Sequence, residues 1–167
     1  MRRCLVVHSA RWVFIAGLAL FFLPCDGFGG ALSVLEARLG EVVDGDTIRL
    51  SDGRKVRYIG VDAPEVRRRS GGEWVYDPEP WSEEATRQNK LWTEGNVLRL
   101  EFDPDVPNDR HGRLLAYVFA DGVFVNEALL RGGLARVYIV GPHTLYRRLF
   151  KDAEAEAMQY RRGLWSK

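Results

Sequence analysis

The chain has 167 residues, of which 46% are hydrophobic and 28% are charged, a composition that suits one globular domain preceded by a leader. Its formal net charge is +1 and becomes −1 without residues 1–31, so any affinity for phosphate must come from local patches of positive charge. Both cysteines, Cys4 and Cys25, lie in those residues, which excludes a disulfide framework and thiol catalysis for the rest of the chain.

Residues 1–31 have the pattern of a secretory signal peptide. Two arginines follow the first methionine, and the apolar run Trp12–Leu23 is 12 residues long, which is short for a membrane span. We therefore expect export to the periplasm or the medium, with residues 32–167 as the folded domain. An uncleaved N-terminal membrane anchor is the alternative. Lipid attachment at Cys25 is a further one, although Pro24 fits that signal poorly.

The leader is followed by residues that predict three strands and a tight turn. Residues 35–43 form the first expected strand, and polar and apolar residues alternate over 46–50 with the period of a second strand. Ser51-Asp52-Gly53 forms a hairpin turn, because glycine readily adopts positive φ. Residues 56–61 run back as the third strand, and Pro64 stops it because proline cannot donate to a sheet.

Three acidic residues of this hairpin region, Asp46, Asp62 and Glu65, have the hard oxygen ligands that suit a divalent metal ion. Taken singly, such acids at turns are more often only part of the turn, and an arginine in a strand is more often a surface charge. Arg57 and Asp62 are an odd number of residues apart, so a regular strand would place them on opposite faces. We therefore expect a bulge or bend near Gly60 if the two act together.

Residues 66–80 are predicted to form an exposed loop near this site. The arginine triplet Arg67-Arg68-Arg69 is either a solvated surface or a phosphate contact. Three aromatic residues, Trp74, Tyr76 and Trp81, either pack the loop against the domain or stack on nucleic-acid bases.

The remaining chain alternates between short strands and helices. Helices are expected over residues 81–93, from 125 to the glycines at 132–133, and over 144–162, and strands over 98–102, 114–119, 123–124 and 134–139. Burial is expected for Ala85, Leu91 and Trp92 on the first helix, and for the row Leu145, Leu149, Ala153 and Ala157 on the last. Periodicity alone therefore supports an α+β class with a strand-rich first half.

Several blocks in one order make the chain resemble the staphylococcal nuclease (thermonuclease) family over roughly residues 34–165. The resemblance implies an OB-fold five-stranded β-barrel with about three helices. The blocks are Asp44-Gly45-Asp46-Thr47, Arg57, Asp62-Ala63-Pro64-Glu65, Asp109-Arg110-His111-Gly112-Arg113, Leu115-Ala116-Tyr117-Val118, Val125-Asn126-Glu127-Ala128-Leu129 and Gly133-Leu134-Ala135-Arg136-Val137.

The resemblance also implies a Ca²⁺ site. Asp46 and Asp62 match its carboxylate ligands, and Asp44 matches a second acid near the metal. Ala63 stands where the family often has threonine and supplies a backbone carbonyl, which alanine retains.

Five further positions carry over as reacting or substrate-binding residues. Arg57 and Arg113 match two catalytic arginines, and Glu65 matches the general base. His111 stands where the family often has a tyrosine that contacts phosphate, and Tyr138 lies near the base-stacking tyrosines but is offset from them. Both are expected to bind substrate.

Together with the leader, the resemblance implies an exported, Ca²⁺-dependent endonuclease that hydrolyses DNA and RNA to 3′-phosphate products. We expect a monomer without an obligate protein partner. One alternative is a non-catalytic OB-type module of the cell envelope that binds nucleic acid or protein. Another is a Ca²⁺-stabilised envelope protein, which leaves the arginines unexplained. Retention of the full set of acids and arginines favours the nuclease.

Overall fold

The structure, a computed structural model, describes residues 32–103, 106–141 and 145–166. The strands in these ranges are β1 (Ser33–Val42), β2 (Thr47–Leu50), β3 (Lys55–Tyr58), β4 (Gly60–Asp62), β5 (Arg67–Ser70), β6 (Glu73–Tyr76), β7 (Val97–Phe102), β8 (Leu114–Ala120), β9 (Val123–Phe124) and β10 (Arg136–Tyr138). The helices there are α1 (Ser82–Thr93), α2 (Val125–Arg131), α3 (Arg147–Gln159) and the short 3-10 helix η1 (Gly163–Trp165).

The predicted leader lies outside the described residues, so signal peptide and anchor both stay predictions. In the part of the chain that the structure describes, no helix is long and apolar enough to cross a membrane.

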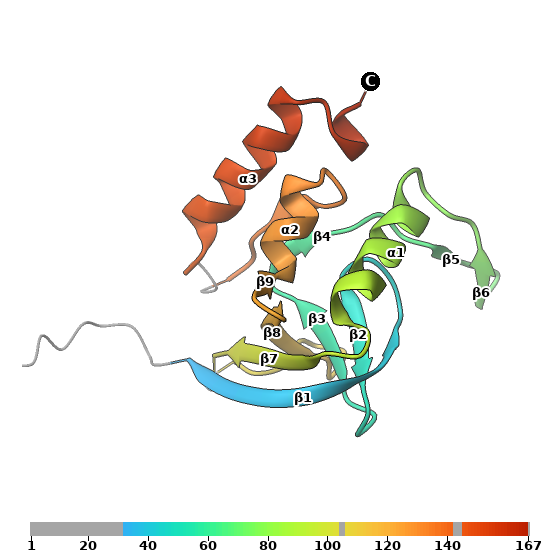
Figure 1. The fold of residues 1–167 in the computed structure, drawn as a ribbon. Helices are drawn as coiled ribbons and strands as arrows, with labels where there is room; N and C mark the ends of the chain where they lie inside the picture. Colours follow the sequence, from blue (N-terminus) through green and yellow to red (C-terminus); the bar gives the residue numbers. More distant parts are fainter. Residues whose placement is uncertain (1–31, 104–105, 142–144, 167) are drawn as a thin grey trace, which may run out of the picture.

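Five strands of the described domain close into a barrel (Figure 1). Neighbours in the order β3-β2-β1-β7-β8 are antiparallel, and a parallel pairing of β3 with β8 closes the sheet on itself. The long strand β1 takes part in two pairings because its register shifts between Leu39 and Glu41, where it passes from β7 to β2. With the three α-helices of the described ranges, this confirms the predicted fold class.

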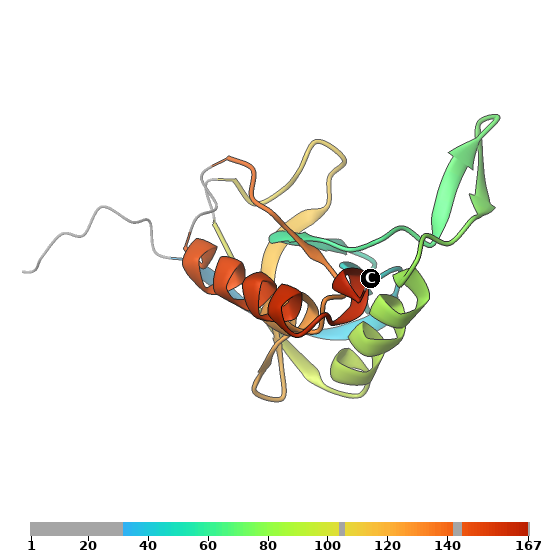
Figure 2. The same cartoon turned by 90° about the horizontal axis from the view of Figure 1, so that it is seen from above.

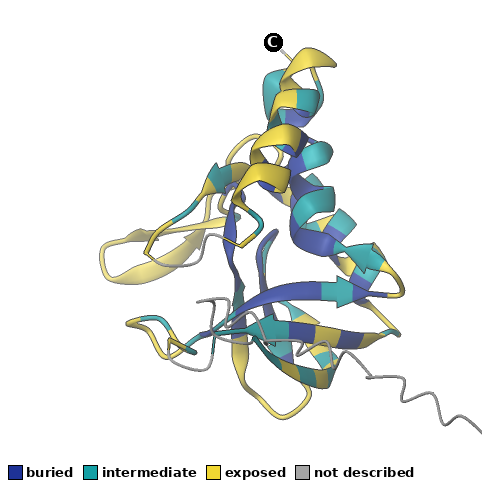
Figure 3. Cartoon of the chain, turned by 90° about the vertical axis from the view of Figure 1, so that its left-hand side faces the viewer, coloured by how far each residue is buried: buried dark blue, intermediate teal, exposed yellow. Residues whose placement is uncertain are grey.

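The core fills the barrel and continues under the helices. The even-numbered residues of β8, from 114 to 120, are all buried, as the two-residue period of a strand requires. On the other face of β8, the Tyr117 ring meets Tyr146 and Phe150 at centroid distances of 4.7 and 6.1 Å, which joins α3 to the barrel. Figure 3 shows buried residues on the sides of the strands and helices that face one another. Each large side chain so buried stabilises the fold by about 1.5–3 kcal/mol.

The single strand predicted over residues 56–61 is in fact two. β3 ends at Tyr58, and the chain bends at Gly60, whose φ is +81°, a value that residues with a Cβ atom rarely adopt. β4 then leaves the barrel and pairs with β10, with Val61 opposite Val137. The bend expected near Gly60 is therefore present.

Residues 67–76, predicted to be part of a loop, form a two-stranded hairpin. The hairpin of β5 and β6 extends away from the barrel beyond α1 (Figure 2), and all eight of its strand residues are exposed. Its glycine turn, Gly71-Gly72, has two positive φ angles of +60° and +90°, which is why strands form on both sides of it. Trp74 and Tyr76 therefore do not pack into the core.

The predicted helices are present with shifted ends. Leu91 was expected to be buried on α1 but is 62% exposed, whereas Trp92 packs against the core. Leu145 precedes α3 and is also 62% exposed, and the buried side of α3 is formed by Phe150, Ala153 and Ala157. The tertiary contacts of these helices, rather than their amphipathic rows, decide which residues are covered.

Candidate active site

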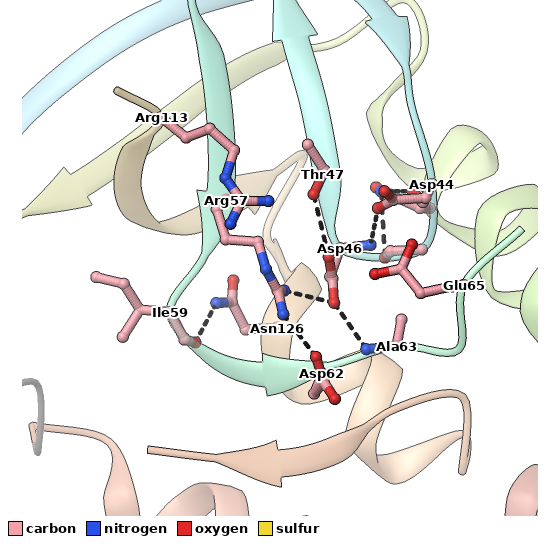
Figure 4. A network of polar contacts seen from close by, with 12 residues as sticks. Asp44, Asp46, Thr47, Arg57, Ile59, Asp62, Ala63, Glu65, Arg113 and Asn126 are labelled. Carbon is pink, nitrogen blue, oxygen red and sulfur yellow. Dashed lines mark hydrogen bonds and ion pairs between the residues drawn. The ribbon is translucent and has the colours of Figure 1, made fainter. Parts of the chain in front are cut away.

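The bend at Gly60 brings an acid of β4 to an arginine of β3. Arg57 Nη2 donates to Asp62 Oδ1 at 2.8 Å, and Arg57 Nη1 forms an ion pair with Asp46 Oδ2 (Figure 4). Both contacts come from one guanidinium group whose side chain is only 14% exposed. The odd spacing of Arg57 and Asp62 is thus reconciled by the bend.

Asp46 is held from several directions. Its carboxyl group accepts the Ala63 backbone N–H at 2.7 Å and the Thr47 hydroxyl at 3.1 Å. Its own backbone N–H donates to Asp44 Oδ1 at 3.0 Å. With 5% of its surface exposed, Asp46 has one fixed orientation.

The acids crowd one another. Burial, together with the nearby carboxylates of Asp44 and Asp62, raises the pKa of Asp46 to about 7, although Arg57 and the Ala63 N–H act to lower it. Partial desolvation also raises the pKa of Glu65, with Asp44 as the next cause. Glu65 points back toward Asp44 and Asp46 (Figure 4). These carboxylates hold more negative charge than Arg57 alone balances, which is the electrostatic condition that favours a bound cation.

This donor set fits a Ca²⁺ ion. Asp46 and Asp62 offer carboxylate oxygens, and the Asp62 side chain is 55% exposed, so that water and a phosphate oxygen can approach it. The described residues contain no group of three or more His, Cys, Asp or Glu side chains at metal-binding distances. Backbone and water oxygens would therefore have to complete the coordination, and Ala63 is the expected backbone donor.

The loop before β8 holds the second arginine. Asp109 Oδ2 accepts from Arg113 Nε at 2.7 Å, while Asp109 Oδ1 accepts the backbone N–H groups of His111 and Arg113 at 2.8 and 3.0 Å. Gly112, with φ of +75°, makes the tight turn possible. Asp109 belongs to one of the blocks that resemble the family, but it was not predicted as a site residue. An acid four residues before an arginine, with a glycine between them, is the sequence signal for such a loop.

Both arginines line one hollow of about 520 Å³. His111 and Tyr138, the two predicted substrate-binding residues, lie on its walls, so the structure brings them to the same place. His111 Nε2 accepts from Arg110 Nε at 3.1 Å, and Tyr138 is 57% exposed. The volume is in the range of pockets that hold a small ligand, roughly 300–1,000 Å³.

The family model described as "Staphylococcal nuclease homologue" matches residues 55–167. The chain belongs to the staphylococcal nuclease family. It is 40% identical over 138 residues to the endonuclease YncB of Bacillus subtilis, covering 80% of this chain and 63% of that protein. It is 39% identical over 138 residues to the SPbeta prophage-derived endonuclease YokF of the same organism, covering 80% of this chain and 45% of that protein.

A further relative is the thermonuclease of Staphylococcus intermedius, 35% identical over 129 residues that cover 75% of this chain and 73% of that protein. The two Bacillus relatives are longer, so the match spans less than two thirds of each. The region that the family model matches includes Arg57, Asp62, Glu65 and Arg113. Asp46 lies before the first residue of that region.

Two buried asparagines position this staphylococcal nuclease site, and neither was predicted as a site residue. Asn126, on α2, donates to the Ile59 carbonyl at 2.8 Å and accepts the Val118 N–H at 2.9 Å, which ties the bend before Gly60 to the barrel (Figure 4). Asn89, on α1, donates to the Asp44 carbonyl at 3.1 Å. No local pattern could have found either one, because the partners lie far away in the sequence.

Proposed function

We propose that this chain is an exported, Ca²⁺-dependent endonuclease that hydrolyses phosphodiester bonds of DNA and RNA. The observation that carries the proposal is the arrangement of Arg57 between Asp46 and Asp62, with Glu65 pointing toward Asp44 and Asp46. Names such as endonuclease and thermonuclease among the relatives support the same reaction class.

The two arginines neutralise the phosphate in this mechanism. Asp109 occupies Arg113 Nε, and neither Nη group of Arg113 has a hydrogen bond to a described residue, so both are free to donate to phosphate oxygens. Arg57 is already oriented by its two carboxylate partners. A two-pronged guanidinium contact gives stronger and more directional binding than an ammonium group. These guanidinium groups would thus stabilise the charge that develops on the phosphate oxygens without having to reorient.

Glu65 is the group that accepts the proton of the attacking water. Desolvation raises the pKa of its carboxyl group, which makes it a better base than an ordinary surface glutamate. Asp46, Asp62 and the Ala63 carbonyl would hold calcium, which when bound supplies Lewis-acid polarisation of the phosphate. His111 and Tyr138 would bind the nucleotide in the adjoining hollow.

Export is the part of the proposal that rests on residues 1–31, through their basic start and apolar run. Its test is N-terminal sequencing of the protein recovered from culture medium or periplasm. A start after about residue 31 supports a cleaved signal, and the intact N-terminus in the membrane fraction supports the anchor.

The activity is tested with purified protein on single- and double-stranded DNA and on RNA, first with Ca²⁺ and then with EGTA. The expected result is cleavage that EGTA abolishes, with 3′-phosphate ends on the products. No cleavage from a folded protein would favour the non-catalytic binding module. Cleavage that persists in EGTA would retain the nuclease and remove the calcium requirement.

A further inference from the structure

The β5–β6 hairpin has one face that combines positive charge with aromatic rings. In its antiparallel register Arg67 lies opposite Tyr76, and Arg69 lies opposite Trp74. Residues directly opposite each other, and residues two apart on a strand, lie on the same side of a sheet. These four side chains therefore form one surface, which we call the arginine–aromatic face (Arg67, Arg69, Trp74 and Tyr76).

The charges on this face are not neutralised within the described residues. Arg67 and Arg69 form no ion pair with a described residue, whereas Arg68, on the opposite face, binds Asp77 through Nε and Nη2 at 2.7 Å each. The hairpin thus directs its uncompensated positive charge to one side. A free guanidinium beside an aromatic ring suits a phosphate next to a base.

The aromatic rings of the face are available for contact. Trp74 is 68% exposed and Tyr76 is 60% exposed, and neither stacks on another aromatic ring of the described residues. The Tyr76 hydroxyl bonds to Glu83 of α1, which fixes one side chain of the face relative to the domain. Large exposed aromatic side chains gathered on one surface mark a binding site more often than scattered ones do.

This face continues into the candidate active site. Arg67 and Trp74 line a hollow of about 490 Å³ whose other walls include Lys55, Glu65 and Arg113. Arg113 also lines the hollow that holds Tyr138. A strand whose phosphate is bound by Arg113 can therefore reach Tyr138 on one side and Trp74 on the other.

We propose that the arginine–aromatic face is a subsite for single-stranded nucleic acid, in which a base stacks on Trp74 while Arg67 and Arg69 bind the flanking phosphates. The subsite rests on the proposed nuclease function, because it places the rest of the strand beside the phosphate that is cleaved. Single strands fit better than duplexes, since only an unpaired base offers its full face to a protruding ring. A chain with almost no net charge would thus gain affinity for nucleic acid from the local positive charge of the arginine–aromatic face.

The first test measures binding by fluorescence anisotropy, using a labelled thymidine oligonucleotide about ten nucleotides long and the full chain in EGTA. Trp74→Ala is expected to weaken binding by about 5- to 100-fold, the effect of losing one base–aromatic stack. Arg69→Ala is expected to weaken it and to flatten its dependence on salt. Arg68→Ala is the matched control, because it removes the same residue type from the opposite face.

The second test separates the subsite from the chemistry. With Ca²⁺, Trp74→Ala should raise the KM for the oligonucleotide by a larger factor than the KM for a chromogenic nitrophenyl phosphodiester of one nucleoside, and should leave kcat for both similar. The short substrate lacks the flanking nucleotides that the proposed subsite would bind.

Each outcome has a distinct reading. Wild-type binding by Trp74→Ala and Arg69→Ala would overturn the subsite and leave the nuclease intact if the unaltered chain still cleaves. Equal losses from Arg68→Ala and Arg69→Ala would also overturn it, because the effect would then not belong to one face. If the unaltered chain binds the strand through Trp74 but cleaves nothing, the subsite stands and the nuclease function fails.

Discussion

Arg57 of β3 and Arg69 of β5 both lie on β-strands, but the fold places their side chains in opposite environments. Arg57 is 14% exposed at its side chain and is fixed by Asp46 and Asp62, whereas Arg69 is exposed on the hairpin and has no ion-pair partner among the described residues. A reacting phosphate needs groups that are already oriented, and a passing strand needs groups that can adapt to it. The comparison therefore separates a rigid centre (Asp46, Arg57 and Asp62, with Glu65 beside them) from an adaptable arm, which is the β5–β6 hairpin.

Among the changes at the rigid centre, replacing Glu65 should lower the rate of catalysis most. Glu65→Ala is expected to lower kcat by about 10²- to 10⁴-fold, because the water loses its proton acceptor. The melting temperature should stay within a few degrees of the unaltered protein, since Glu65 is exposed. Near-normal turnover by a folded Glu65→Ala protein would remove its assigned role.

The second prediction concerns the bend at Gly60, which brings Asp62 to Arg57. A Cβ atom at Gly60 would lie 2.5 Å from Phe150 Cε2, at a φ of +81° that already disfavours side chains. Gly60→Ala should cost about 2–4 kcal/mol in unfolding free energy, from strain and overpacking together. Denaturant unfolding measures this change. Gly53→Ala is a useful control, because its φ is +90° but nothing lies near its Cβ position.

Asn126 tests whether polar contacts or packing keep the bend in place. Asn126→Ala leaves the Ile59 carbonyl and the Val118 N–H without their partner, at a cost of about 1–3 kcal/mol. Activity measured well below the melting temperature should fall as well, because Asp62 follows this bend. Unchanged stability would show that β3 and β4 hold their positions without the asparagine.

The pH dependence of stability tests the loop of Arg113. Burial raises the pKa of Asp109, but hydrogen bonds from Arg113 and the His111 backbone outweigh it, so the net pKa lies below the ordinary 3.8. Its stabilising contribution is therefore complete above about pH 4 and is lost as the pH falls through the lower, folded-state pKa. Asp109→Asn should be less stable at neutral pH and approach the unaltered protein in acid. Urea titrations from about pH 2 to pH 7 measure both curves, and a constant gap between them would contradict the assignment.

The smallest effect is expected on the adaptable arm. Trp74→Ala should change the unfolding free energy by no more than about 0.5 kcal/mol, because the ring is exposed and packs against nothing in the core. Calorimetry measures the unfolding free energy of Trp74→Ala and of Trp92→Ala. A larger loss is expected for Trp92→Ala, since Trp92 packs against the core. A large loss at Trp74 would show that the hairpin face is structural.

The sequence by itself determined most of the regular elements of the barrel and the resemblance to the family. Alternation over residues 46–50 and 98–102 predicted strands that exist, because local periodicity follows directly from which face is buried. The blocks from Asp44 to Arg113 led to the correct fold class, and they named residues that the structure brings to one site. The roles of those residues stay predictions until they are tested.

Only the tertiary structure decided how these elements meet. The break at Gly60 depends on pairing with β10, and the exposure of Leu91 depends on what lies over α1. The roles of Asn126 and Asn89 depend on carbonyl groups distant in sequence. The two faces of the β5–β6 hairpin follow from a register that its turn sets. The first three are contacts between distant segments, about which a local pattern of residues carries no information. The hairpin register is different, because the local Gly71-Gly72 turn sets it.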